Sequence, residues 1–133
     1  MLEYLSITND VDRAKKFFES FLGYTTGPYN LHELIKKDVN SFNLVDVREY
    51  EDYTRGHIPF ATHIPFEKLK DNLKRIQREK PTIVYCYDET CNLAKKAANV
   101  LLQEYFPTIE LIGGFESWKN HGYDVVRTKA TNE

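Results

Sequence analysis

The fold of this chain is decided by the stretch TIVYCYDETCNLAKKAANVLLQEY, at residues 82–105. Its first four residues, Thr82 to Tyr85, are β-branched or aromatic and predict a central strand of a covered sheet. From Asn92 to Tyr105 the apolar residues recur at helical spacing and predict a helix with one inward face. A strand that passes through a short loop into a helix is the repeating unit of α/β proteins.

The same alternation continues on both sides of this unit. Further strands are predicted at residues 44–47, 61–64 and 109–112, and further helices at residues 9–22, 31–37, 49–55 and 66–76 and around Trp118. Strands that alternate with helices predict a parallel α/β sheet. Ligands of such sheets bind beyond the carboxyl ends of the strands. Cys86 and the segment from Asp46 to Arg48 lie at two of these ends, so both are candidates for a functional site.

Length and composition predict a single domain. The chain has 133 residues, of which 41% are hydrophobic and 14% aromatic, enough for one packed core without disulfides or metals. Within the domain 1–133, residues 1–28 are predicted to form an N-terminal helical extension that packs on the core at residues 29–127. A dimer contact is the other use for the apolar face of this extension, so we expect a monomer or a weak dimer.

Charge and hydropathy argue against several classes of protein. Positive and negative residues are interleaved and the net charge is −2, so the basic stripe of a nucleic-acid binder is missing. The longest apolar run, Ile83 to Tyr87, is far shorter than a membrane span. The N-terminal residues lack the basic and apolar regions of a signal peptide, which predicts a cytoplasmic protein. The histidines are scattered and no Cys-x-x-Cys pair is present, so no metal site is predicted.

Two cysteines, Cys86 and Cys91, occur in the loop between the strand at 82–85 and the helix at 92–105. The first turn of a helix presents unpaired N–H groups and partial positive charge. A thiol held there, with curved loop amides aimed at it, loses its proton more easily and becomes a nucleophile. The same donors would hold a persulfide anion on that sulfur. The alternative interpretation of Cys86 is a buried core cysteine, since free cysteine is commonly buried.

Three segments, taken together and in this order, resemble the rhodanese-like domain family over residues 29–126. They are FNLVDVRE at residues 42–49 with GHIP at 56–59, IVYC at 83–86 before a helix, and GGFESW at 113–118 with GY at 122–123. The resemblance implies an α/β fold that is doubly wound, with three layers and a central, mainly parallel sheet. Residues 1–28 would be an N-terminal helical extension to the family's domain.

The resemblance also implies a sulfurtransferase. Cys86 would be the catalytic residue, which accepts a sulfane sulfur, becomes a persulfide and passes the sulfur to a thiol or another nucleophile. The partners would be a small sulfur donor and a thiol or protein acceptor, and no cofactor would be needed. The substrate-binding loop, whose amides would stabilise the thiolate and the persulfide, would consist of Tyr87, Asp88, Glu89, Thr90, Cys91 and Asn92.

The loop departs from the family's commonest pattern, Cys-x-x-Gly-x-Arg-Ser. It has no glycine and no arginine, but it has two acids, Asp88 and Glu89. A like charge at about 4 Å from thiosulfate costs roughly 1 to 4 kcal/mol. We therefore expect weak activity on thiosulfate and a preference for a persulfide or polysulfide donor. Phosphatase chemistry is excluded, because Asn92 stands where the Cys-x5-Arg arrangement needs a guanidinium.

Cys91 and the pair Asp46 and Arg48 have two interpretations each. Cys91 is either a resolving thiol, which attacks a persulfide or sulfenic acid on Cys86 and leaves a disulfide, or a small residue packed at the helix start. Asp46 and Arg48 are expected to form a structural ion pair that supports the pocket, rather than to act in catalysis. Two other functions stay open: a non-catalytic rhodanese-homology module that binds a protein partner, and a thiol redox sensor that uses Cys86 and Cys91.

Overall fold

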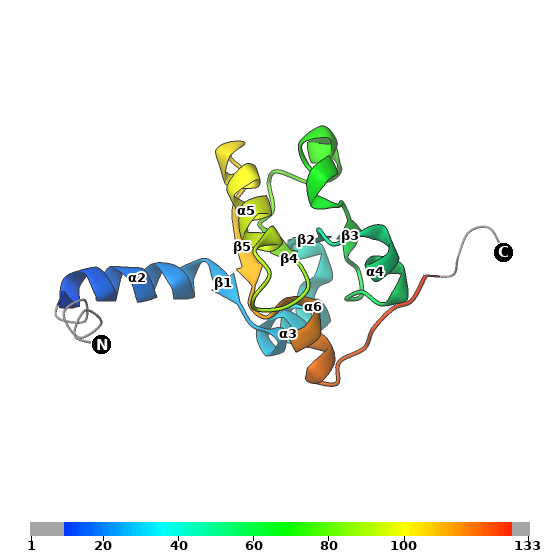
Figure 1. Ribbon diagram of the computed structural model, residues 1–133, viewed down its shortest axis with the longest axis horizontal. Coiled ribbons are helices and arrows are strands. Elements are labelled where there is room, and N and C mark those ends of the chain that lie inside the picture. The colour runs from blue at the N-terminus through cyan, green and yellow to red at the C-terminus, as the bar shows by residue number, and fades with distance from the viewer. Residues whose placement is uncertain (1–9, 129–133) are drawn as a thin grey trace.

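The computed structural model describes residues 10–128 and contains, within that range, one five-stranded sheet with helices on both faces (Figure 1). The strands are β1 (Thr25–Thr26), β2 (Asn43–Asp46), β3 (Thr62–His63), β4 (Thr82–Tyr85) and β5 (Thr108–Leu111). The strand order is β1-β5-β4-β2-β3, and every neighbouring pair is parallel. The helices are α2 (Val11–Gly23), α3 (Pro28–Asp38), α4 (Tyr50–Arg55), α5 (Leu93–Gln103) and α6 (Gly114–Asn120), with the 3₁₀ segments η1 (Val39–Ser41), η2 (Phe66–Lys68) and η3 (Lys70–Arg75).

The core consists of two apolar layers, one on each face of the sheet. Successive side chains of a strand point to opposite faces, so Val84 packs on one face and Ile83 on the other. On the Val84 face the cover comes from α5, η2 and η3. On the Ile83 face it comes from α3, η1 and α6, including the buried Trp118. The predicted three-layer α/β fold with a parallel sheet is confirmed.

Two predictions of local structure are wrong. No strand was predicted between the helices expected at residues 9–22 and 31–37, but Thr25 and Thr26 form β1 and pair with Glu110 and Leu111 at the edge of the sheet. Two residues carry too little pattern to predict a strand whose partner is far along the chain. The helix expected at residues 66–76 is instead η2 and η3, interrupted by non-helical backbone at Asn72 (φ −128°, ψ 22°).

The N-terminal helix α2 does not pack on the core, contrary to the prediction for residues 1–28. None of its residues is buried, and Phe17 and Phe18 are 60% and 61% exposed. Figure 1 shows α2 extending away from the sheet beyond β1. Helices α5, α3 and α6 cover the two faces of the sheet, and α2 precedes β1, the strand at the edge of the sheet, so it lies outside these layers. Residues 1–9, which include the start predicted at Asn9, lie outside the described residues.

The helix α2 begins at a capping side chain, that of Asp10. The Asp10 side chain accepts a hydrogen bond of 3.1 Å from the Arg13 amide, which caps the helix. Phe17 contacts Phe18 and Phe21 along the same side of the helix, with ring centroids 5.1 and 6.2 Å apart. Among residues 10–128, no helix has both the length and the apolar character that crossing a membrane requires.

Candidate functional site

The site is built on the loop at residues 86–92, between the carboxyl end of β4 and the start of α5. Cys86 directly follows β4, and its side chain continues the Val84 face of the sheet, among apolar neighbours that include Val45 and Ala97. The residue is only 1% exposed. The Cys86 thiol therefore lies at the expected carboxyl end of the sheet, but on the face of the sheet that α5 covers.

The start of α6 holds the beginning of this loop. The amide of Phe115 donates to the Cys86 carbonyl at 2.9 Å, and the amide of Glu116 donates to the Tyr87 carbonyl at 2.9 Å. A Cβ atom on Gly114 would lie 2.6 Å from the Cys86 carbonyl oxygen, and Gly114 has φ +57°, so both sterics and backbone conformation require glycine there. The contact of Gly114 with Cys86 was not predicted from the sequence.

Asp46 and Arg48 form the expected ion pair below the loop. Arg48 Nε lies 3.1 Å from both Asp46 carboxylate oxygens and Nη2 lies 2.8 Å from Oδ2, while Nη2 also donates to the Gly56 carbonyl at 2.6 Å. The guanidinium carbon lies 4.2 Å from the centre of the Phe115 ring. The residues are 0% and 3% exposed. Burial opposes the charged form of Arg48, yet the hydrogen bonds and charge of Asp46 outweigh it and raise the pKa of Arg48.

Tyr87 ties the loop to α4, a role that sequence reasoning missed. Its hydroxyl donates to Asp52 Oδ2 at 2.8 Å and accepts from the Glu49 amide at 3.2 Å. Burial is the largest of the causes that raise the pKa of Tyr87, and the neighbouring Asp52 adds to it. No local pattern signals this tether, because α4 and the loop are distant in the sequence.

The Asp88 carboxylate accepts hydrogen bonds from two of the loop amides that were expected to surround Cys86. Its Oδ1 accepts from the Thr90 amide at 2.9 Å, from the Thr90 hydroxyl at 2.7 Å and from the Cys91 amide at 3.1 Å. These bonds with Thr90 lower the pKa of Asp88. A carboxylate is a stronger acceptor than a neutral thiol, so the amides turn toward Asp88. The expectation that all the amides from Tyr87 to Asn92 face Cys86 is therefore wrong.

The two cysteines are free and in contact. The Cys86 thiol lies 3.5 Å from the Cys91 carbonyl oxygen, to which it donates. Burial raises the pKa of Cys86 to about 12, against opposing N–H groups of Ala94 and Tyr87. At Cys91, which is half-buried, burial opposes ionisation, but the Cys86 thiol and the N–H groups of Leu93 and Tyr87 outweigh it and lower the pKa. The thiol with a lowered pKa, which we expected to be Cys86, is Cys91.

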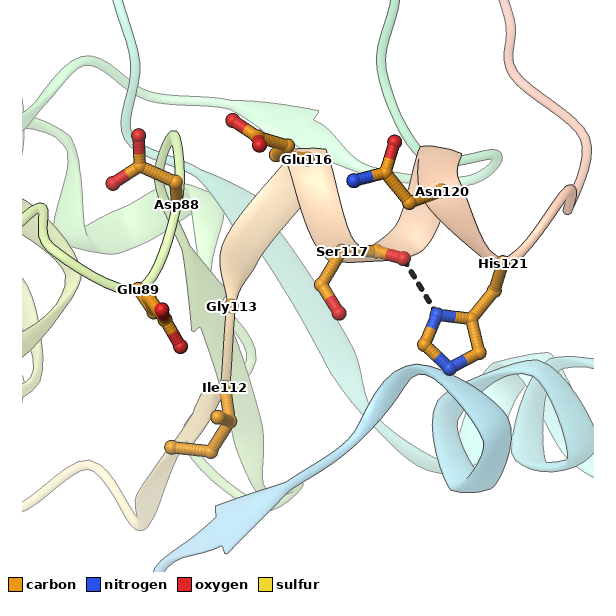
Figure 2. Close-up of a pocket in the computed structure, with 8 residues that line it drawn as sticks. All are labelled: Asp88, Glu89, Ile112, Gly113, Glu116, Ser117, Asn120 and His121. Carbon is orange, nitrogen blue, oxygen red and sulfur yellow. Dashed lines mark hydrogen bonds between the residues drawn. The ribbon is translucent and has the colours of Figure 1, made fainter.

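A cavity of about 410 Å³ lies beside the loop (Figure 2). It is lined by Asp88, Glu89, Ile112, Gly113, Glu116, Ser117, Asn120 and His121. Three of these residues are acidic and none is lysine or arginine, so the cavity disfavours anions. The Nδ1 atom of His121 lies 2.7 Å from the Ser117 carbonyl oxygen, within the turn that ends α6. Within residues 10–128, no three His, Cys, Asp or Glu residues are grouped closely enough to hold a metal ion.

Solved structures of known proteins share this architecture. The BH2092 protein from Bacillus halodurans superposes with a TM-score of 0.82 at 39% sequence identity, covering 88% of this chain and 86% of that chain. The rhodanese-related protein from Thermoplasma volcanium superposes with a TM-score of 0.68 at 29% identity, covering 77% of this chain and 97% of that chain. The fold therefore has solved counterparts over most of the chain.

Sequence comparisons agree with the structural ones. The HTH-type transcriptional regulator Rv0324 of Mycobacterium tuberculosis is 30% identical over 92 residues, which are 69% of this chain and 41% of that protein. The thiosulfate sulfurtransferase GlpE of Coxiella burnetii (strain RSA 331 / Henzerling II) is 37% identical over 90 residues, which are 67% of this chain and 80% of that protein. The family model of the Rhodanese-like domain matches residues 27–121, so the chain belongs to the rhodanese-like domain family.

Proposed function

We propose that this protein is a sulfurtransferase that holds sulfane sulfur as a persulfide on a cysteine of the loop at residues 86–92. The observation that carries the proposal is the contact between two free cysteines, Cys86 and Cys91, at the carboxyl end of the parallel sheet. Family membership and the 37% identity to a protein named as a thiosulfate sulfurtransferase support the same reaction class.

The chemistry needs a thiolate, a sulfane sulfur donor and a nucleophilic acceptor. A loop thiolate attacks the outer sulfur of the donor, the donor's S–S bond breaks, and the remainder of the donor leaves as a thiolate or sulfite. A thiol or another nucleophile then attacks the outer sulfur of the protein persulfide and returns the cysteine to its thiolate. Cys86 occupies the position that the family resemblance assigns to the carrier, and Cys91 supplies a second thiol next to it.

The charges around the loop favour one class of donor. Asp88 and Glu89 line the cavity together with Glu116, and no cationic residue lines it. Thiosulfate carries two negative charges, whereas an organic persulfide or a short polysulfide carries fewer or spreads them over a longer chain. We therefore expect a persulfide or polysulfide to be used in preference to thiosulfate, because like charges at close range raise the barrier.

The test is to incubate the full chain with inorganic polysulfide and measure the intact mass. We expect a mass increase of one sulfur atom that dithiothreitol reverses and that is absent from the Cys86→Ser/Cys91→Ser double variant. Circular dichroism of the double variant is the control for folding. An unchanged mass in the folded wild-type chain would contradict the proposal and favour a protein-binding module.

A thiol redox sensor is the second candidate function. It is favoured by the contact between the Cys86 thiol and Cys91, and by the similarity to a protein named as a transcriptional regulator. The same mass measurement separates the two functions, since formation of a Cys86–Cys91 disulfide lowers the mass by two hydrogen atoms. A disulfide without any persulfide would favour the sensor.

A further inference from the structure

We propose that this protein forms a dimer with twofold symmetry, in which α2 of each copy lies in a groove beside α5 of the other copy. Two apolar surfaces at the β1 edge of the sheet carry the proposal, one on α2 and one between α5 and β1. Neither surface is covered within residues 10–128, and each is the kind of cover that the other needs. The dimer is independent of the sulfurtransferase function proposed above.

The first surface, the α2 face, is the apolar side of an amphipathic helix. Its members recur at helical spacing and are Val11, Ala14, Phe17, Phe18, Phe21 and Leu22. The five larger side chains are between 42% and 74% exposed, and no residue of α2 is buried. A 13-residue helix is only marginally stable in water unless another surface covers its apolar face. The α2 face therefore requires a cover that residues 10–128 of the same copy do not supply.

The second surface, the α5 groove, is a cavity of about 260 Å³ between α5 and the β1 edge of the sheet. Its apolar lining comes from four side chains, those of Tyr24, Ala98, Leu102 and Ile109. Two charged side chains also line it, Lys95 and Glu110, and they form an ion pair of 3.0 Å with each other. Because these two charges neutralise each other, the groove favours an apolar partner over an ionic one.

The α2 helix of the same copy does not enter this groove. Tyr24 follows directly after α2 and lines the groove, and Figure 1 shows the helix extending away from the sheet beyond β1. Two copies related by a twofold axis can each place α2 beside the α5 groove of the other, so that one repeated contact covers both surfaces on both chains. A second copy supplies a helix and a groove that this chain already has, which favours it over an unrelated partner.

The dimensions of the two surfaces also agree. The 13 residues of α2 span about 20 Å and the 11 residues of α5 about 16 Å, so the two helices can pack along most of their lengths. An aromatic side chain offers roughly 150 to 250 Å². The exposed apolar side chains of the α2 face and the α5 groove therefore present roughly 700 to 800 Å² on each copy. A stable complex buries roughly 800 Å² on each partner, so this area is sufficient for a dimer.

Sedimentation velocity of the full chain at micromolar concentrations tests the dimer. We expect a species of twice the chain's mass. Phe18→Glu, on the α2 face, should raise the dissociation constant at least about a hundredfold, because each dimer loses two buried rings. Leu102→Glu, in the α5 groove, should also dissociate the dimer. The matched controls are Lys16→Glu, on the opposite side of α2, and Lys96→Glu, on α5 outside the groove lining, and both should leave the dissociation constant nearly unchanged. All four side chains are exposed, and fluorescence of the buried Trp118 is the control for folding.

A mixture of Phe18→Glu and Leu102→Glu tests the exchange of α2 directly. A pair of these two chains keeps one intact contact, between α2 of the Leu102→Glu chain and the groove of the Phe18→Glu chain. The mixture should therefore associate more tightly than either variant alone. A monomeric wild-type chain would overturn the dimer, and sulfur loading by that monomer would leave the sulfurtransferase function standing. Dissociation by Phe18→Glu but not by Leu102→Glu would overturn the α5 groove as the position of α2 and indicate pairing between two α2 helices.

Discussion

At the scale of single residues, the environment of each ionisable group decides its role more than its identity does. Cys86 and Cys91 are the same residue type five positions apart, yet burial raises the pKa of one and hydrogen-bond donors lower the pKa of the other. Asp88 shows the same principle, because its carboxylate removes amides from the sulfur and holds Cys91 instead. The chemistry of this loop therefore depends on which anion each N–H group faces.

The buried ion pair gives a prediction for stability at this scale. We expect Asp46→Asn to lower the free energy of unfolding by about 3 to 5 kcal/mol, because the buried Arg48 would keep its charge without an anionic partner. Urea denaturation measures the change. The matched control is Glu110→Gln, which breaks a pair with the half-exposed Lys95 and should cost less than about 1 kcal/mol. Equal losses of unfolding free energy in the two variants would show that the buried pair stabilises the fold no more than the pair of Lys95 and Glu110.

Asp88 gives a prediction for donor choice. Asp88→Asn keeps an oxygen acceptor for the amides of Thr90 and Cys91 but removes one negative charge from the cavity. We expect the ratio of thiosulfate to polysulfide turnover to rise about fivefold, as for removal of roughly 1 kcal/mol of repulsion. Glu104→Gln, at the far end of α5, is the control and should leave the ratio unchanged. If Asp88→Asn leaves this ratio unchanged, repulsion by the Asp88 charge is not the reason for weak activity on thiosulfate.

At the scale of elements, the site depends on how closely α6 approaches the end of β4. The amides of Phe115 and Glu116 bind the carbonyls of Cys86 and Tyr87, so a helix that follows β5 fixes the direction of a loop that follows β4. This contact explains physically why the first residue of α6, Gly114, is a glycine. The helix α2 is the opposite case, since its sequence predicts the helix but no neighbouring element covers it.

Gly114→Ala tests the contact between α6 and the loop. The added Cβ would lie 2.6 Å from the Cys86 carbonyl oxygen at a φ of +57°, so α6 must shift and release the loop. We expect a loss of more than about 1 kcal/mol in the free energy of unfolding and slower sulfur loading. Gly23→Ala is the control, because its Cβ would meet no atom within 4 Å and should change neither quantity by much. A Gly114→Ala chain that matches the wild type in both would disprove the role given to α6.

At the scale of the whole molecule, the two thiols give the stability a defined pH dependence. The pKa of Cys86 is raised from 9.0 to about 12 in the folded protein, so between these values the unfolded chain binds fewer protons than the folded one. The free energy of unfolding is therefore expected to fall as the pH rises from 9 toward 12. Cys91 has the opposite sign, since its lowered pKa adds stability as the pH rises toward 9.

Urea denaturation at several alkaline pH values measures this dependence. Buried tyrosines such as Tyr85, whose pKa burial also raises, add to the loss of stability at high pH. The comparison is therefore between the wild type and Cys86→Ser, and we expect the decline to be shallower in the variant. Identical slopes would mean that the Cys86 thiol ionises as easily in the folded protein as in the unfolded chain.

The elements that could be read from the sequence are those with strong local patterns. The β-branched run of β4 and the helical spacing of α5 predict their elements within two residues, and the alternation of strands and helices predicts the parallel sheet. The two residues of β1 could not be predicted, because their pairing with β5 is a contact across the chain. The 3₁₀ form of residues 66–75 was missed for a related reason, since apolar spacing does not distinguish it from an α-helix.

The amino-acid order was sufficient for the family, the layer architecture and the position of Cys86 at the end of a strand, because these follow from periodicity and short motifs. The spatial arrangement was needed to learn that Cys86 is covered, that Asp88 takes the loop amides and that Gly114 touches the Cys86 carbonyl. Burial and hydrogen-bond partners come from segments far apart along the chain, so a thiol's reactivity becomes defined only when those segments pack together.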